Sequence, residues 1–142
     1  MDAVRGLLRE YAASLAFDLD FQDFDRELAT LPGAYDAPHG ALLGARLRGA
    51  LAGCVALRRI DDERGELKRL YVRPNERGSG LGHALAEAAI DEARRLGYRR
   101  LLLDTTPGME QAQALYERLG FVDTEPYTQN PVPGTRFLAL EL

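Results

Sequence analysis

The chain reads ELKRLYVRPNERGSGLGHALAEAAIDEARRL from Glu66 to Leu96, and this stretch predicts a strand, a turn and a helix. Residues 66–72 favour a strand, which Pro74 ends because proline donates no backbone hydrogen bond. Apolar side chains then recur at helical spacing over residues 80–96. The apolar run 100–104 predicts a buried strand, joined in parallel to the first strand by a right-handed crossover through that helix.

The flanking segments complete a sheet with helices around it. Helical spacing and turn residues predict helices at 3–15, 22–30 and 109–119. Apolar runs and turn residues predict a hairpin of 41–47 with 51–57 and closing strands at 121–125 and 135–142. The central helix is expected to bury one stripe, made of Leu81, Ala84, Leu85, Ala88, Ala89 and Leu96. The length of 142 residues suits a single domain spanning 1–142.

Composition excludes several classes of protein. The net charge of −4 disfavours a nucleic-acid binder, which needs a basic surface. Cys54 is the single cysteine, so no internal disulfide or thiolate metal cage forms, and His39 and His83 are isolated from other ligands. Seventeen arginines accompany one lysine, Lys68. Charges within residues 1–14 and the absence of a 20-residue apolar run predict a soluble, cytoplasmic protein without a membrane span.

The glycine-rich turn suits anion binding, because its N–H groups and the helix dipole attract negative charge. A P-loop needs a lysine after its last glycine, and no lysine follows this turn. A dinucleotide fingerprint would use Gly78 and Gly80, but His83 occupies the third glycine position, and residues 73–76 separate the turn from its strand. Asp104 does lie where a ribose-binding acid would. A tight helix entry without a ligand is the purely structural interpretation.

Two motifs together resemble the GNAT superfamily of N-acetyltransferases. The first is Leu70-Tyr71-Val72-x-Pro74 with Arg77-x-x-Gly80-x-Gly82, similar to that family's acyl-CoA signature, and the second is Ala112-x-x-Leu115-Tyr116-x-x-x-Gly120-Phe121. The resemblance covers residues 66–122 and implies a mixed α+β (α/β) fold. In that fold a mostly antiparallel central sheet is flanked by helices, and only 66–72 and 100–104 pair in parallel. Members of the family usually begin with a short strand, whereas here the first helix begins almost at Met1, so that strand is expected to be reduced or absent, or to precede this sequence.

Acetyl-CoA is the co-substrate that this resemblance implies, without a metal. The turn amides would cradle its pyrophosphate, and the strand backbone would pair with the pantetheine arm. The residues concerned are Leu70, Tyr71, Val72, Arg77, Gly78, Ser79, Gly80, Leu81 and Gly82. The first N–H of that strand backbone would face the acetyl carbonyl as an oxyanion donor. Met109 stands where many family members carry an asparagine that contacts the pantetheine.

Transfer to an amine requires a neutral nitrogen, whereas under about 0.1% of a lysine-like amine is neutral at pH 7. Glu66 is the expected general base, working through a water, and a solvent-facing strand residue is its structural alternative. Tyr116 stands where family members place the tyrosine that faces the CoA sulfur, although it could instead be a core tyrosine. Tyr71 could face substrate or pack in the core, and Cys54 is expected to be a small buried apolar residue.

The expected function is acetyl transfer from acetyl-CoA to the primary amine of a small molecule, by direct attack in a ternary complex. A protein-lysine or N-terminal acetyltransferase is an alternative within the enzyme class, and a non-catalytic acyl-CoA-binding module is an alternative outside it. The resemblance also allows a homodimer. An acidic segment, which could attract a cationic amine or be a solvated face, contains Asp18, Asp20, Asp23, Asp25 and Glu27.

Overall fold

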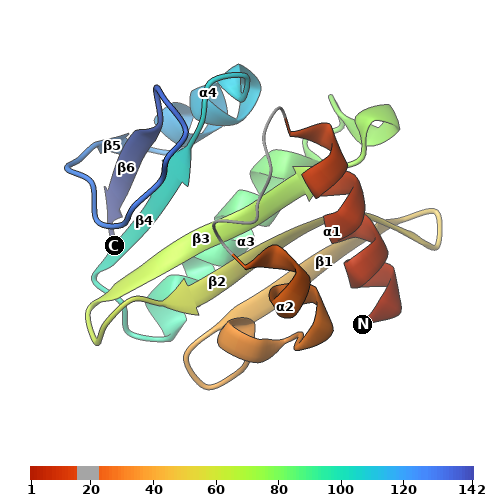
Figure 1. Ribbon diagram of the computed structural model, residues 1–142, viewed down its shortest axis with the longest axis horizontal. Coiled ribbons are helices and arrows are strands. Elements are labelled where there is room, and N and C mark those ends of the chain that lie inside the picture. The colour runs from red at the N-terminus through yellow and green to blue at the C-terminus, as the bar shows by residue number, and fades with distance from the viewer. Residues whose placement is uncertain (16–22) are drawn as a thin grey trace.

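Six strands form one mixed sheet in the computed structural model, which describes residues 1–15 and 23–142 (Figure 1). The strand order is β1-β2-β3-β4-β6-β5. The strands are β1 (Ala41–Leu47), β2 (Ala50–Arg59), β3 (Arg64–Val72), β4 (Arg100–Thr105), β5 (Val122–Asp123) and β6 (Arg136–Glu141). Only β3 and β4 pair in parallel, and all other neighbours are antiparallel. The predicted mixed fold with a single parallel pair is therefore confirmed.

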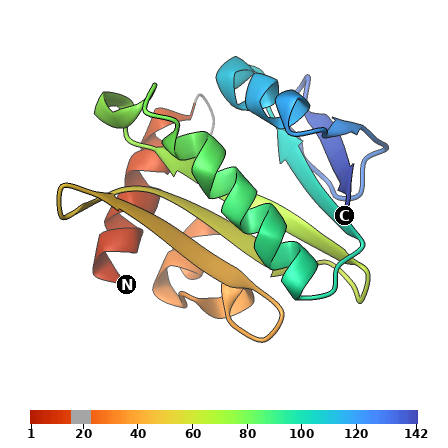
Figure 2. The same cartoon turned by 180° about the vertical axis from the view of Figure 1, so that it is seen from behind.

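The helices cover both faces of this sheet. They are α1 (Asp2–Ser14), α2 (Phe24–Ala29), α3 (Leu81–Arg95) and α4 (Glu110–Arg118), with 3-10 turns at Gly33–Tyr35 and Pro74–Glu76. Helices α1 and α2 lie on the face seen in Figure 1, and α3 crosses the opposite face seen in Figure 2. No strand precedes α1 in the part of the chain that the structure describes, and no helix there is long and apolar enough to span a membrane.

Each face has its own hydrophobic core. Leu85, Ala89 and Ala93 of α3 pack with inward side chains of β2, β3, β4 and β6, including the fully buried Leu101 and Leu138. On the other face, Leu7 and Leu8 of α1 pack with buried side chains of α2 and the sheet: Phe24, Leu28, Cys54, Ala56 and Tyr71. The two cores hold the central strands between them, which makes β3 and β4 a rigid support for side chains that project from their ends.

The predicted face of α3 is partly wrong. Leu85 and Ala89 are buried as expected, but Ala84 and Ala88 are exposed. Ala86, Ile90 and Ala93 are buried in their place. An alanine-rich helix carries a weak apolar pattern, and the side chains of the sheet decide which of its alanines face inward. The closing strand predicted at 121–125 is also shorter, because only Val122–Asp123 pairs with β6.

Strands β3 and β4 pair over a short stretch and then separate. Their parallel register ends at Glu66 opposite Leu102, although β3 continues to Val72 and β4 to Thr105. A bulge lies just beyond, where β3 has an extra residue opposite β2 between Lys68 and Tyr71. Arg69 within it has a φ of +59°, in the left-handed region that a non-glycine residue rarely adopts. Bulges bend a strand and increase its twist, so this one directs the end of β3 away from β4.

Candidate active site

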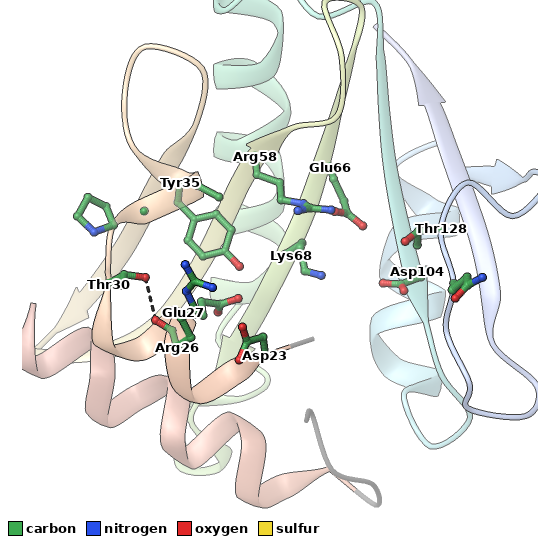
Figure 3. A pocket seen from close by; sticks show the side chains of 14 residues that line it. Asp23, Arg26, Glu27, Thr30, Tyr35, Arg58, Glu66, Lys68, Asp104 and Thr128 are labelled. Carbon is green, nitrogen blue, oxygen red and sulfur yellow. Dashed lines mark hydrogen bonds and ion pairs between the residues drawn. The ribbon is translucent and has the colours of Figure 1, made fainter. Parts of the chain in front are cut away.

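Two cavities lie where β3 and β4 diverge. The larger, of about 410 Å³, is lined by α2, the turn after it, β2, β3, β4 and residues 128–129 (Figure 3). The smaller, of about 50 Å³, lies between β3, β4 and α4. Lys68 and Asp104 line both cavities. Because these two side chains stand at a common boundary, the two cavities meet in the slot between the strands. We call them the acceptor cavity and the slot cavity.

Glu66 lies in the wall of the acceptor cavity and is only 1% exposed. Arg58 Nε donates to its Oε1 at 2.5 Å, and the Tyr127 hydroxyl donates to its Oε2 at 2.5 Å. These two donors compensate the buried carboxylate, which would otherwise be costly to remove from water. Burial raises the pKa of Tyr127, and the neighbouring charge of Glu66 adds to this effect, so the phenol stays a hydrogen-bond donor. Neither Arg58 nor Tyr127 was predicted from the sequence as a site residue.

Lys68 was also missed as a site residue, and Asp104 was considered only as a ribose-binding acid. Burial lowers the pKa of the Lys68 amine, while the opposite charges of Glu66 and Asp104 partly counteract that effect. Asp104 Oδ2 accepts a 3.0 Å hydrogen bond from the side-chain amide of Asn130. Lys68 could have been singled out from the sequence because it is the one lysine of the chain, beside seventeen arginines. The structure thus adds an amine and a second carboxylate to the boundary between the cavities.

Tyr116 of α4 lines the slot cavity and is 6% exposed. Its ring packs edge-on against Phe121, with centroids 5.6 Å apart. Burial raises the pKa of its phenol, which therefore stays protonated at neutral pH. The buried hydroxyl of Thr106, just beyond β4, lines the same cavity and has no hydrogen-bond partner among the described residues. A buried hydroxyl without a partner is costly, so a polar ligand group in this cavity would satisfy it.

The glycine-rich turn leads into α3 as the sequence predicts. Gly78 and Gly80 have φ of +86° and +84°, a conformation that glycine adopts without a steric penalty. Beyond the adjacent residues of the chain, no heavy atom of the described residues lies within 4 Å of the position a Cβ would take at either glycine, so the turn faces open space. Arg77 does not extend into that space, because its Nε donates to the Val72 carbonyl at 3.0 Å and its guanidinium lies over the Tyr71 ring.

The structure also shows where several other side chains that the sequence singled out are located. Tyr71 is 6% exposed and packs edge-on against Tyr11 at 5.8 Å, so it belongs to the core on the α1 face. Cys54 is fully buried, as expected of an apolar core residue, and its thiol donates to the Arg69 carbonyl at 3.4 Å. In the acidic segment, Asp23 and Glu27 line the acceptor cavity and Asp25 is exposed. Asp18 and Asp20 lie outside the described residues.

This architecture, a mixed sheet whose two parallel strands separate beside two adjoining cavities, is that of an acyltransferase fold. Residues 3–121 match the model of the acetyltransferase (GNAT) family. An uncharacterized N-acetyltransferase of Schizosaccharomyces pombe is 40% identical over 144 residues, which is 100% of this chain and 88% of that protein. The chain therefore belongs to the GNAT acetyltransferase family, and it is an N-acetyltransferase by class.

Solved structures agree with this fold. An acetyltransferase from Streptococcus agalactiae superposes with a TM-score of 0.80 at 24% identity, over 97% of this chain and 91% of that chain. A GNAT family acetyltransferase from Elizabethkingia anophelis with acetyl-CoA bound gives a TM-score of 0.66 at 24% identity, over 85% and 82% of the two chains. The predicted fold and family are thus confirmed.

Proposed function

We propose that this protein transfers the acetyl group of acetyl-CoA to the primary amine of a small molecule, by direct attack within a ternary complex. The observation that carries the proposal is the meeting of two cavities at Lys68 and Asp104, between strands that have separated. The thioester would lie in the slot cavity and the amine in the acceptor cavity. Both substrates can then be present at once, which direct attack requires.

Acetyl-CoA would be held chiefly by backbone groups. Its pyrophosphate would accept hydrogen bonds from the N–H groups of residues 77–82, where α3 begins and where its unpaired amides and dipole favour an anion. Its pantetheine arm would extend along residues 70–72 of β3, which β4 leaves unpaired. The buried hydroxyl of Thr106 is available to a polar group of that arm.

The reaction would begin with a neutral amine that attacks the thioester carbonyl carbon. A carbon–nitrogen bond forms, and the negative charge that develops on the carbonyl oxygen would be stabilised by a backbone N–H of β3 near the bulge. Glu66 would accept the proton from the amine through a water. Its two oxygens accept one bond each from Arg58 and Tyr127, and a carboxylate has room for about four, so capacity for that water remains.

Collapse of the intermediate would then break the carbon–sulfur bond and release CoA. Tyr116 would donate a hydrogen bond to the departing sulfur. A phenol of pKa about 10 is a weaker acid than a simple thiol of pKa about 8.5, and burial raises the pKa of Tyr116 further. Complete proton transfer to the thiolate is therefore uphill, and the hydroxyl would act by stabilising developing charge, with the thiol reaching its final protonation state as the products leave.

A thiol-release assay tests the proposal. The purified protein would be incubated with acetyl-CoA and a panel of primary amines, and product would be identified by a mass increase of one acetyl group. CoA affinity would be measured by calorimetry on the same preparation. Release of CoA together with an acetylated amine is the expected result. CoA binding without release for any amine would indicate the non-catalytic binding module, and acetylation of proteins alone would indicate the protein acetyltransferase.

A further inference from the structure

The acceptor cavity contains charges of both signs, and two of its acids are already neutralised by arginines. Glu27 accepts two hydrogen bonds of 2.9 Å from Arg69, whose side chain is 2% exposed. Glu66 is paired with Arg58 and bonded by Tyr127. These pairs hold α2 and the cavity wall together, and they leave Glu27 and Glu66 with little net attraction for an incoming cation.

The remaining acids of the lining are Asp23 and Asp104. Asp104 receives a hydrogen bond from the uncharged amide of Asn130, so its negative charge is not compensated by an arginine. Asp23 is exposed at the start of α2. Acids that no arginine pairs in the described residues therefore lie both beside the slot, next to Lys68, and at the outer wall of the cavity.

The remaining cations of the lining are Arg26 and Lys68. Within residues 1–15 and 23–142, the Arg26 guanidinium takes part in no ion pair, although it lines the cavity. Lys68 lies beside the slot, near the opposite charges of Glu66 and Asp104. Apart from the pairs that Glu27 and Glu66 form with arginines, the charged side chains of the lining are thus two acids and two cations, with no excess of either sign.

This balance discriminates between kinds of amine. A polyamine needs an excess of acidic side chains, and the arginines that pair with Glu27 and Glu66 remove that excess. An aromatic or aliphatic amine needs an apolar wall, whereas the charged groups of this cavity would lose hydration against it without gaining a partner. A small molecule that carries both an ammonium and a carboxylate can contact an acid and a cation of this lining at the same time.

We propose that the acceptor is a small zwitterion of the free amino acid type, bound with its ammonium at Asp104 and its carboxylate at Arg26. Asp104 borders the slot, where the amine must arrive. Arg26 lines the acceptor cavity but not the slot cavity, and it lies across the acceptor cavity from Asp104 (Figure 3). A guanidinium forms paired, charge-assisted hydrogen bonds with a carboxylate, which gives orientation as well as affinity. This inference rests on the proposed N-acetyltransferase function and specifies its substrate class.

The test compares acceptors that differ in one charge. The twenty common amino acids, their carboxamides, spermidine and phenethylamine would be assayed with acetyl-CoA by thiol release. Loss of a charged, paired hydrogen bond reduces affinity by about 10- to 100-fold. The best free amino acid should therefore exceed its own carboxamide by about that factor in kcat/KM. Arg26→Gln should bring the ratio close to one, whereas Arg9→Gln, an exposed arginine of α1 outside the lining, should leave it unchanged.

A second readout does not depend on turnover. Protein loaded with CoA would be titrated with the same amino acid and its carboxamide in a calorimeter. Carboxamides, spermidine or phenethylamine that equal or exceed every amino acid in the assay would overturn the zwitterion site while leaving the N-acetyltransferase function intact. Absence of turnover with every acceptor would count against the proposed function, and the titration would then decide the zwitterion site by itself: equal affinities for acid and amide would refute it.

Discussion

Tyr127 and Glu66 are 61 residues apart in the chain, yet the tyrosine hydroxyl lies 2.5 Å from the glutamate Oε2. This hydrogen bond ties the irregular segment between β5 and β6 to the wall of the acceptor cavity. A second tie of the same kind joins Asn130 to Asp104 at 3.0 Å. Tyr127 and Asn130 are thus bonded to carboxylates on the two strands that separate, and these bonds hold the segment beside both cavities, which its residues 128–130 help to line.

Replacement of Tyr127 by phenylalanine should therefore weaken the fold measurably. It removes a hydrogen bond to a charged, buried carboxylate, which is worth about 1.5–3 kcal/mol of unfolding free energy. Tyr98→Phe is the matched control, because the Tyr98 hydroxyl donates at 2.6 Å to a neutral carbonyl, that of His39, and its loss should cost only about 0.5–1.5 kcal/mol. Urea denaturation measures both. A Tyr127 variant as stable as the native protein would show that the bond contributes nothing.

Glu66→Gln should lower kcat and flatten the rise of the rate on the basic side of the pH profile, with CoA affinity retained. The amide keeps the size of the side chain but cannot accept a proton at these pH values. Glu92→Gln is a suitable control, since Glu92 is a surface acid of α3 that pairs with Arg95. If the pH profile of the Glu66 variant matched that of the native protein, Glu66 would be a structural partner of Arg58 and Tyr127 only.

Tyr116→Phe should reduce kcat by about 10- to 1,000-fold, the range expected when one hydrogen bond to developing charge is lost. The edge-on ring contact with Phe121 is retained in this variant, so folding and acetyl-CoA binding should stay close to native values. Steady-state kinetics and calorimetry separate the two effects. Native turnover would make Tyr116 a core residue, and a loss of CoA affinity would give its hydroxyl a binding role.

Gly80→Val should abolish CoA binding, because a branched side chain would occupy the open space in front of the helix amides. Any residue other than glycine is also strained at φ +84°, at a cost of about 1–2 kcal/mol. Gly97→Val controls for that strain, since Gly97 ends the same helix at φ +91° and also has open space around it. Both variants should be destabilised, and only the first should lose CoA in calorimetry. Equal CoA affinity in the two would place the pyrophosphate elsewhere.

Cys54 should not react with thiol reagents in the folded protein at pH 8. Burial raises the pKa of its thiol to about 12, so almost none of it is thiolate at that pH, and the side chain is fully buried. Above pH 12 the thiolate would form, and urea should expose one reactive thiol per chain at pH 8. A native sample mixed with a disulfide dye measures this directly, and a rapid colour change would contradict the predicted burial.

Local patterns in the sequence predict most of the elements of this fold. The hairpin is one such case, since Arg48-Gly49 form its turn with φ of +52° and +80°. The position of β3 between an antiparallel and a parallel neighbour follows from the family motif. Side-chain partners far apart in sequence were not predictable, because no local periodicity reports that Arg58 and Tyr127 converge on Glu66. The site residues Lys68 and Asp104 were hidden for the same reason, as each is an ordinary polar residue within its own strand.

The bulge at Arg69 has a consequence for how β3 tolerates change. Glu66 and Lys68 project to the side of α2, and simple alternation would put residues 70 and 72 there as well. Instead Tyr71 lies on that side, while Leu70 and Val72 pack with the core beneath α3. The strand thus joins two stretches of opposite phase at one residue. Deletion of Arg69 would remove the bulge yet keep these faces, because regular alternation from Lys68 then puts Leu70 and Val72 toward α3 and Tyr71 on the side of α2. A one-residue insertion or deletion elsewhere in β3 would exchange the two faces, so it should be far more harmful there than in the hairpin turn.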